Sequence, residues 1–254
     1  MDNWIRRFHP APGARMRLLC FPHAGGTAGS YHALSASVEG AVEPLIVQYP
    51  GRLDRFTEPF AERLDDVVDA VLDELDADDR PLALFGHSMG ALLAFATARR
   101  LAAAGRAPAV LFVSGREGPS LPVRTRLPES PSDDELLAEL RLLSGTAAEL
   151  LDSPEFLQLA LPPLRADYRM LAAYSCPPGP PLGCPVVALT GDSDPRVSVD
   201  GVGAWERETD GPFTRHVLPG GHFYLDDHRA YVADVITSVC GSAVSAVQPF
   251  ISFG

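Results

Sequence analysis

Residues 82–90 read LALFGHSMG, and this stretch decides the fold that we expect for the 254-residue chain. Its first four residues are apolar and predict a buried strand, and the small apolar residues after Gly90 predict a helix. The Gly-x-Ser-x-Gly segment between them has the spacing of a nucleophile elbow, a strained turn that exposes a serine hydroxyl. The spacing alone is a weak signal, but its position between a strand and a helix identifies Ser88 as the candidate nucleophile.

Short apolar runs alternate with helical patterns along the rest of the chain. The runs that predict strands are 17–21, 45–49, 82–85, 110–114, 186–190 and 215–218. Helical spacing is found at 65–75, 91–104 and 231–239. This alternation predicts an α/β protein with a mostly parallel central sheet and helices on both faces. Together with the elbow, it predicts an α/β-hydrolase fold, with one domain over residues 1–254.

One connection is much longer than a single crossover helix requires. Residues 116–184 separate two predicted strands, and within them leucines between 136 and 143 have helical spacing. Residues 156–171 predict a second helix. The segment is therefore expected to be a helical insertion that covers the end of the sheet. We expect it to act as a lid and to form one wall of an apolar acyl channel.

A serine nucleophile needs a general base, and the base needs a third group to orient it. Of the seven histidines, only His222 lies in a glycine-rich loop directly after the last predicted strand, which fits the Ser, Asp, His order of this fold. The acid should follow the preceding strand, where Asp192 and Asp194 both occur. Spacing does not distinguish these two aspartates, and the other one would cap its own turn.

A tetrahedral oxyanion needs two backbone N–H donors. The first donor is the backbone N–H of Met89, the residue after the nucleophile. The second donor is a backbone N–H from the loop after an early strand. That loop is residues 21–26, in which glycines allow the backbone to turn its amides inward. Ala24 is the expected second donor.

Composition excludes several classes of protein. The formal net charge of -12 disfavours a general nucleic-acid binder, because phosphate neutralisation requires excess positive charge. No apolar run approaches the roughly 18–20 residues needed to span a bilayer, and the first ten residues lack the apolar core of a signal peptide, so a cytoplasmic location is expected. The four cysteines lack paired spacing, so we expect reduced structural thiols and no metal or redox cofactor.

Five motifs together resemble one family, the discrete type II thioesterases that accompany polyketide and nonribosomal peptide synthases. The motifs are CFPHAGG at 20–26, QYPGR at 48–52, FGHSMG at 85–90, LPPLRADY at 161–168 and GGHF at 220–223. The resemblance covers nearly the whole chain. The sequence departs from the family pattern at two places. In the expected lid, the usual Gly-Gly-Thr-Pro turn is replaced by SGTA at 144–147, and the tail, 243–254, has no counterpart in the family.

The resemblance implies hydrolysis of acyl groups from the phosphopantetheine arm of acyl or peptidyl carrier proteins. It also assigns the acid to Asp194, with Asp192 as its neighbour. Carrier proteins are usually acidic, so docking to this acidic chain would require a local basic patch, for which Arg116, Arg124 and Arg126 are candidates.

Two other functions remain open at the level of sequence. The same serine, histidine and aspartate would serve a stand-alone carboxylesterase or lipase. A non-catalytic binding module on the same fold is the second alternative, and the complete set of candidate catalytic residues argues against it.

Replacement of Ser88 by alanine should abolish hydrolysis and leave the fold intact, because the elbow accepts a small residue and the nucleophile has no substitute. Losses in related triads are roughly a millionfold. Turnover by the purified variant, measured beside its circular dichroism spectrum, checks this expectation. Substantial turnover by a folded variant would show that Ser88 is not the nucleophile.

Overall fold

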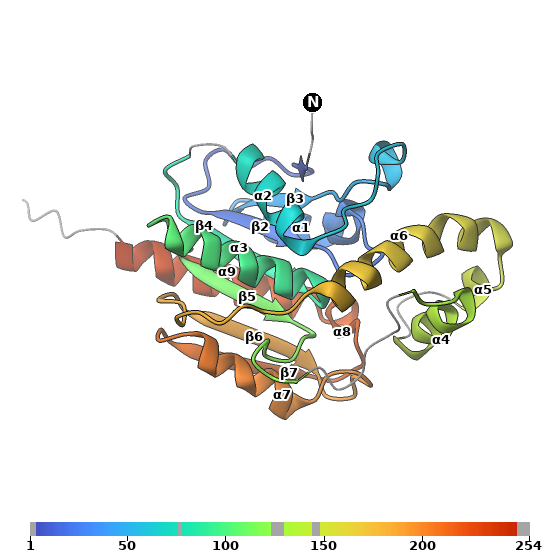
Figure 1. The fold of residues 1–254 in the computed structure, drawn as a ribbon. Helices are drawn as coiled ribbons and strands as arrows, with labels where there is room; N and C mark the ends of the chain where they lie inside the picture. The colour runs from blue at the N-terminus through green and yellow to red at the C-terminus, as the bar shows by residue number, and fades with distance from the viewer. Residues whose placement is uncertain (1–3, 76–77, 123–129, 144–147, 248–254) are drawn as a thin grey trace, which may run out of the picture.

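The computed structural model describes residues 4–75, 78–122, 130–143 and 148–247. Within these residues seven strands form one sheet in the order β1-β3-β2-β4-β5-β6-β7 (Figure 1). The strands are β1 (Ile5–Arg6), β2 (Arg17–Phe21), β3 (Glu43–Val47), β4 (Leu82–His87), β5 (Val110–Ser114), β6 (Val186–Gly191) and β7 (Phe213–Leu218). β1 pairs antiparallel with β3, and the other pairings are parallel. The mostly parallel sheet confirms the fold class predicted from the sequence.

The predicted strands are all present, with differences at their ends. The strand expected at 45–49 is Glu43–Val47 in the structure, two residues earlier at each end. Gln48 follows the strand, and its side-chain amide donates to the carbonyl oxygens of Tyr49 and Arg52, at 3.2 and 3.4 Å. The sequence analysis did not predict β1, since two residues are too few for a periodic pattern.

Helices cover both faces of the sheet. Helices α2 (Leu64–Glu74) and α3 (Met89–Ala103) pack on one face, and α1 (His32–Ser37) and α9 (Arg229–Val247) pack on the other (Figure 1). Neighbouring strand residues supply the two cores in turn: Leu84 faces α2 and α3, and Phe85 faces α1 and α9. The last helix is longer than expected, so part of the predicted tail is helical; residues 248–254 lie outside the described residues.

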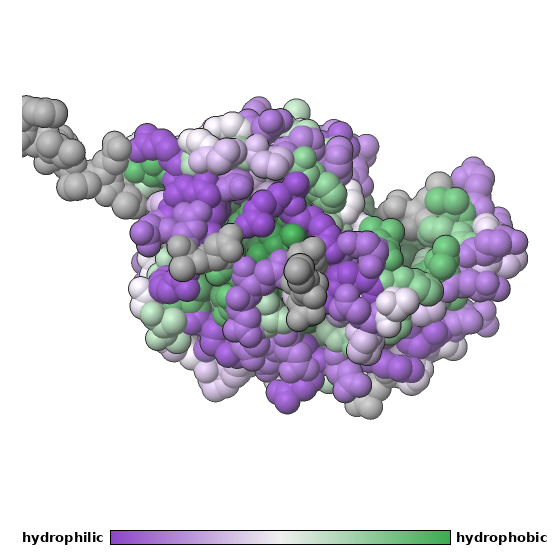
Figure 2. Space-filling view, turned by 90° about the horizontal axis from the view of Figure 1, so that it is seen from above, coloured by the Kyte–Doolittle hydropathy of each residue, from purple (hydrophilic) through white to green (hydrophobic). Residues whose placement is uncertain are grey.

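In the described parts of the 116–184 segment there are three helices, two of which were predicted. They are α4 (Asp133–Leu143), α5 (Ala148–Leu151) and α6 (Pro154–Ala173). Leu136 of α4 packs with Leu161 and Leu164 of α6 in a small separate apolar cluster. These helices project beside the main body (Figure 1). Apolar side chains gather on that projection in Figure 2, and Leu142, Leu150 and Leu159 are exposed there.

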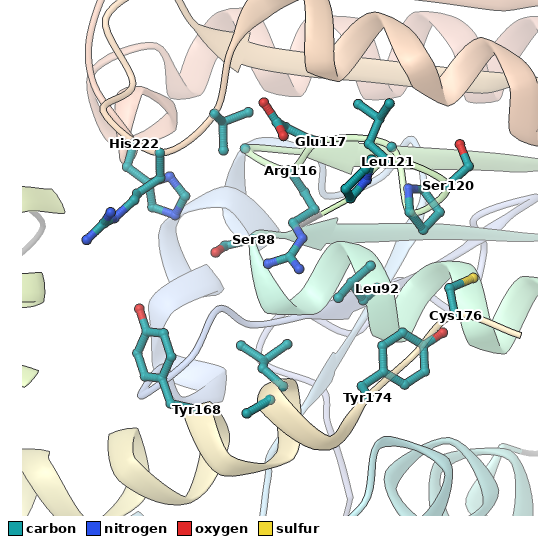
Figure 3. A pocket seen from close by; sticks show the side chains of 18 of the residues that line it. Ser88, Leu92, Arg116, Glu117, Ser120, Leu121, Tyr168, Tyr174, Cys176 and His222 are labelled. Atoms are coloured by element: carbon teal, nitrogen blue, oxygen red, sulfur yellow. The ribbon is translucent and has the colours of Figure 1, made fainter. Parts of the chain in front are cut away.

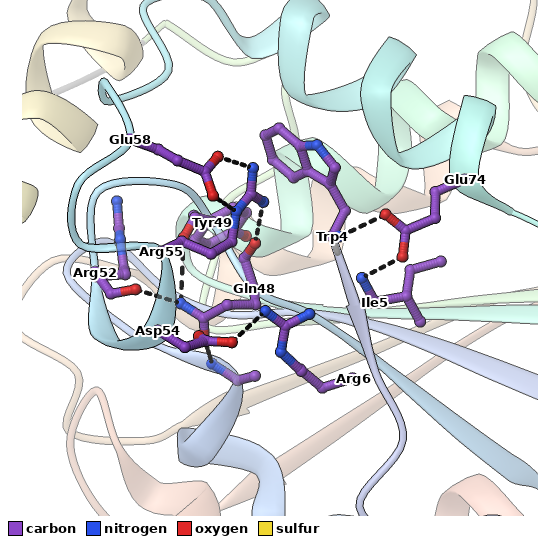
Figure 4. Close-up of polar contacts among 11 residues, drawn as sticks. Trp4, Ile5, Arg6, Gln48, Tyr49, Arg52, Asp54, Arg55, Glu58 and Glu74 are labelled. Atoms are coloured by element: carbon purple, nitrogen blue, oxygen red, sulfur yellow. Dashed lines mark hydrogen bonds and ion pairs between the residues drawn. The ribbon is translucent and has the colours of Figure 1, made fainter. Parts of the chain in front are cut away.

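The turn after β3 is tied to the beginning of the chain (Figure 4). Arg55 donates to the carbonyl oxygen of Gln48 at 2.8 Å, pairs with Glu58, and lies 4.3 Å from the ring centre of Trp4. Glu74 of α2 accepts hydrogen bonds from the backbone N–H groups of Trp4 and Ile5. These contacts hold the turn that carries Arg52, whose role is described below.

Two expectations from composition can be compared with the described residues. All four cysteines are free, including Cys176 and Cys184 at the two ends of a Pro/Gly-rich loop. Within the described parts of the chain, no helix is both long enough and apolar enough to cross a bilayer.

Candidate active site

Ser88 sits on a strained turn between β4 and α3. Its backbone has φ 56° and ψ −113°, and its N–H donates to the carbonyl oxygen of Ser114 at 2.8 Å. Two glycines make the turn possible: a Cβ on Gly86 would lie 2.0 Å from the Gly90 oxygen, and one on Gly90 would lie 1.9 Å from the Phe21 oxygen. Only glycine fits at either position, so the predicted elbow geometry is present and presents Ser88 at the beginning of α3.

His222 is held by Asp194. The ring Nδ1 lies 2.7 Å from Asp194 Oδ2, and the two side chains are 4% and 0% exposed. The other carboxylate oxygen of Asp194 accepts from the N–H groups of Arg196 and Val197, at 2.8 and 3.2 Å. These bonds fix the carboxylate in the orientation that holds one imidazole tautomer.

Asp192 points elsewhere. Its exposed carboxylate accepts from the backbone N–H of Gly220 at 3.0 Å and from the hydroxyl of Ser193 at 2.7 Å. Asp192 therefore links the loop after β6 to the loop after β7 by a hydrogen bond, and has the structural role expected of a residue in a turn. The geometry thus distinguishes two aspartates that spacing left equivalent.

Ser88 and His222 line the same cavity (Figure 3). Among the described hydrogen bonds, none joins the Ser88 hydroxyl to the His222 ring. Such bonds are often long without substrate and shorten in the reacting complex.

The loop that carries Ala24 is held by side chains from three separate segments. The Tyr49 hydroxyl donates to the Pro22 carbonyl at 2.9 Å, and Arg52 donates to the Gly26 carbonyl at 3.0 Å. Asp167 of α6 accepts from the Gly25 N–H at 2.7 Å. The loop therefore has a fixed backbone, as an oxyanion hole requires.

Arg52 and Asp167 also form a buried, bidentate ion pair. The two Arg52 nitrogens lie 2.9 and 2.8 Å from the two Asp167 oxygens, and each side chain is 5% exposed. This pair joins the turn after β3 to α6, with the Ala24 loop between them. The sequence analysis quoted the motifs of both residues without giving either a role, because their partnership spans 115 positions.

Two other histidines lie close to His222. The His87 ring centre is 4.9 Å from that of His222, and its Nδ1 lies 2.9 Å from the Ser114 hydroxyl. Burial, followed by the nearby His222 and His23, holds the pKa of His87 well below its usual range. Burial, with His222 and Arg52, lowers the pKa of His23 to about 4. Both rings are neutral near pH 7, so neither places a competing charge beside His222.

The cavity beside Ser88 has a volume of about 450 Å³. Leu92 of α3, residues 115–122, and Tyr168 and Leu171 of α6 form parts of its wall. Within the described residues, no group of three or more His, Cys, Asp or Glu side chains could hold a metal ion.

Arg116, one of the three arginines expected in a docking patch, lines this cavity (Figure 3). The chain turns inward after β5 at Gly115, which has φ 58°, and directs Arg116 toward Ser88. Arg124 and Arg126, with the SGTA turn at 144–147, lie outside the described residues.

The insertion is also linked to the loop that carries Asp194. Glu139 of α4 pairs with Arg196 and accepts from the Tyr168 hydroxyl of α6 at 3.3 Å. Arg196, two positions after Asp194, is therefore bound to α4 directly, and Glu139 links it to α6.

The parallel sheet, the elbow after β4, the carboxylate after β6 and the histidine after β7 define an α/β-hydrolase. A family model described as a thioesterase domain matches residues 16–240. The chain belongs to this thioesterase family, which agrees with the resemblance recognised in the sequence.

The curated sequences and solved structures that are similar to this chain include two thioesterase sequences and a type II thioesterase structure. The chain is 46% identical over 227 residues to a probable cadicidin biosynthesis thioesterase of Streptomyces griseus. The aligned region covers 89% of this chain and 63% of that protein. It is also 46% identical to thioesterase PikA5 of Streptomyces venezuelae, over 88% of this chain and 80% of that protein. The structure of the type II thioesterase BorB, from the borrelidin biosynthetic cluster, has a TM-score of 0.85 and 45% identity, covering 94% of this chain and 98% of that one.

Substitution of the two aspartates by asparagine should have unequal effects. Asp194→Asn should lower kcat by about four orders of magnitude with little change in KM, because the amide favours the wrong imidazole tautomer. Asp192→Asn should cost far less, since this side chain only ties two loops together. Steady-state kinetics of both variants test the pair, and a larger loss from Asp192→Asn would overturn the assignment.

Loss of one member of the Arg52–Asp167 pair should cost more than loss of both. Asp167→Leu should lower the free energy of unfolding by about 3–5 kcal/mol, because it leaves a buried guanidinium without its carboxylate. The double variant Arg52→Met with Asp167→Leu should recover much of this loss. Urea unfolding of both variants measures the difference.

Turnover should remain low in the double variant even though its stability recovers, since the Gly25 N–H has lost its acceptor and the Ala24 loop is no longer held. A double variant with normal kcat would contradict the positioning role of the pair.

Proposed function

We propose that this chain hydrolyses acyl thioesters carried on the phosphopantetheine arm of acyl or peptidyl carrier proteins in polyketide or nonribosomal peptide synthesis. The observation that carries the proposal is the grouping of Ser88, His222 and Asp194 beside a cavity that the insertion partly encloses. The names of similar proteins, which refer to cadicidin biosynthesis and to the borrelidin cluster, support this class of substrate.

In the first half-reaction, Ser88 Oγ attacks the thioester carbonyl carbon and His222 accepts the hydroxyl proton. Negative charge develops on the carbonyl oxygen, where the backbone N–H groups of Met89 and Ala24 donate hydrogen bonds. The carbon–sulfur bond then breaks, and His222 returns the proton to the departing pantetheine thiol. Ser88 is left as an acyl ester.

In the second half-reaction, His222 removes a proton from water, and the resulting hydroxide attacks the same carbonyl carbon. The same two amides stabilise the second oxyanion. The ester bond breaks, Ser88 recovers its proton from His222, and the acyl group leaves as a free acid. Asp194 stabilises the imidazolium in both halves and does not itself become protonated.

The insertion is the proposed lid of a single domain that spans the whole chain. Its helices contribute Glu139, Leu143, Tyr168 and Leu171 to the cavity wall. Exclusion of bulk water by such a lid would strengthen the hydrogen bonds to the oxyanion, while deacylation requires one water molecule beside His222.

Comparison of an acyl group on a carrier protein with the same acyl group on a simple oxygen ester tests the proposed function. The full chain should release the acid from the carrier thioester with a kcat/KM at least about tenfold above that for the ester, because binding contacts to the arm add to those at the acyl group. Mass spectrometry of the carrier protein measures the loss of the acyl group.

The Ser88→Ala variant, incubated with the same loaded carrier, serves as the matched control for spontaneous hydrolysis. Preference for the oxygen ester would favour the stand-alone carboxylesterase. Absence of turnover on both substrates, together with no labelling of Ser88 by a fluorophosphonate, would favour a binding module.

A further inference from the structure

The loop after β6, which carries the candidate catalytic carboxylate, is held at both of its ends by the main body. We call residues 192–198 the acid loop. At its start, the Asp192 N–H donates to the carbonyl oxygen of Leu218, in β7, at 2.9 Å. At its end, the Ser198 N–H and hydroxyl donate to the Glu117 carboxylate at 3.1 and 2.8 Å. These contacts leave the middle of the loop to be held by other groups.

Arg196, in the middle of the acid loop, is held by the insertion. Its Nε donates to Glu139 Oε1 at 3.1 Å, and a second guanidinium nitrogen donates to Glu139 Oε2. The Glu139 side chain is 7% exposed and that of Arg196 is 29% exposed. Among the described residues, Glu139 is the one hydrogen-bond partner found for this guanidinium. A buried carboxylate of α4 therefore holds the part of the acid loop that the main body does not.

Glu139 is itself fixed by α6. The Tyr168 hydroxyl donates to Glu139 Oε1 at 3.3 Å. Burial, followed by the charge of Glu139, raises the pKa of Tyr168, so the phenol stays protonated and can donate. This part of α6 is anchored to the main body by the buried Asp167–Arg52 pair, and Figure 3 shows Tyr168 and His222 at the end of the cavity opposite Cys176. Glu139 is therefore in place only when α4 lies against the anchored part of α6.

A movement of Arg196 would reach Asp194 through the backbone. The Arg196 N–H donates to Asp194 Oδ1 at 2.8 Å, while Asp194 Oδ2 lies 2.7 Å from His222 Nδ1. Pro195 joins the two residues, and its ring fixes φ, so this link has little freedom to absorb a displacement. A carboxylate that loses its amide donor is free to turn, and the imidazole then loses the group that holds its tautomer and orientation.

We infer that Glu139 is a positioning residue for hydrolysis, which acts through Arg196 to fix the amide that orients Asp194. The triad is complete only while α4 is seated against the acid loop. A displaced insertion leaves Ser88 with a poorly oriented base, so hydrolysis is coupled to closure of the insertion. The inference rests on the proposed function, because it assigns a residue of the proposed lid a role in that hydrolysis.

Glu139 and Arg196 also line the cavity, so a direct contact with the substrate is the alternative role. Each already has the other as its counter-charge, and an uncharged acyl group offers a partner to neither of them. Loss of a contact made equally with bound substrate and transition state would raise KM, whereas loss of triad orientation would lower kcat. The two roles can therefore be separated by kinetics.

Steady-state hydrolysis of acetyl-pantetheine by the full chain tests the inference. Glu139→Gln should lower kcat by about tenfold and leave KM nearly unchanged, since a hydrogen bond between charged groups is weakened. Glu135→Gln is the matched control, one turn earlier in α4, where an exposed carboxylate accepts from the N–H and hydroxyl of Ser132. Its kcat should stay within about twofold of the wild-type value. A wild-type kcat in Glu139→Gln, or a change in KM alone, would overturn the inference.

Variants of Arg196 show whether Glu139 acts through it. Arg196→Met should lower kcat about as much as Glu139→Gln does, and the double variant should be no slower than either single variant, because both changes remove the same link. Arg196→Lys keeps the charge but loses the paired donors, so it should recover part of kcat. Losses that multiply in the double variant would mean independent roles and would contradict the inference.

A measurement without substrate separates this inference from the proposed function. The proton on His222 Nδ1, which is hydrogen-bonded to Asp194, should give a far-downfield proton NMR signal. In Glu139→Gln this signal should broaden through exchange with water, because the carboxylate is less firmly held, and in Glu135→Gln it should match the wild type. An unchanged signal in Glu139→Gln would show that the inference is wrong even if thioesters are hydrolysed. A wild-type chain that hydrolyses no thioester would instead contradict the proposed function.

Discussion

The close approach of helix α3 to strands β2 and β4 is the constraint on which the remaining structure of the site depends. Any side chain at Gly86 or Gly90 would overlap backbone atoms of the neighbouring segment. The chain can therefore pass from strand to helix in one residue, and Ser88 takes a backbone conformation that non-glycine residues seldom adopt. The strain is held because β4 is paired on both sides, to β2 and β5.

Around this turn the protein assembles a rigid polar site from segments that are distant in sequence. Asp194 is fixed by two backbone amides, and the Ala24 loop is fixed by Tyr49, Arg52 and Asp167. A buried ion pair such as Arg52–Asp167 contributes little net stability compared with an apolar pair of similar volume. Its value here is positional, because the same carboxylate that pairs with Arg52 also holds the Gly25 amide.

The charges in and near the cavity follow one pattern. His23 and His87 are neutral because they are buried, and each acidic group of the wall is already bound. The two neutral rings therefore place no positive charge beside His222.

The sequence by itself determined the parallel sheet, the elbow at Ser88 and the choice of His222, because each depends on short-range features: apolar runs, glycine turns and the order of strands. It also indicated the thioesterase family through several motifs together. Strand ends were less accurate, as with Glu43–Val47, since the register of pairing with β1 and β2 decides where the strand begins and ends. Spacing left Asp192 and Asp194 equivalent, and only the family resemblance favoured Asp194. The contact of Asp194 with His222, the hold of Arg52 and Asp167 on the Ala24 loop, and the turn of Arg116 into the cavity are seen only in the tertiary structure. These outcomes depend on how the carboxyl ends of the strands and α6 meet in space. Local patterns carry no information about which separated residues come into contact, whether 28 positions apart, as Asp194 and His222 are, or 115, as Arg52 and Asp167 are.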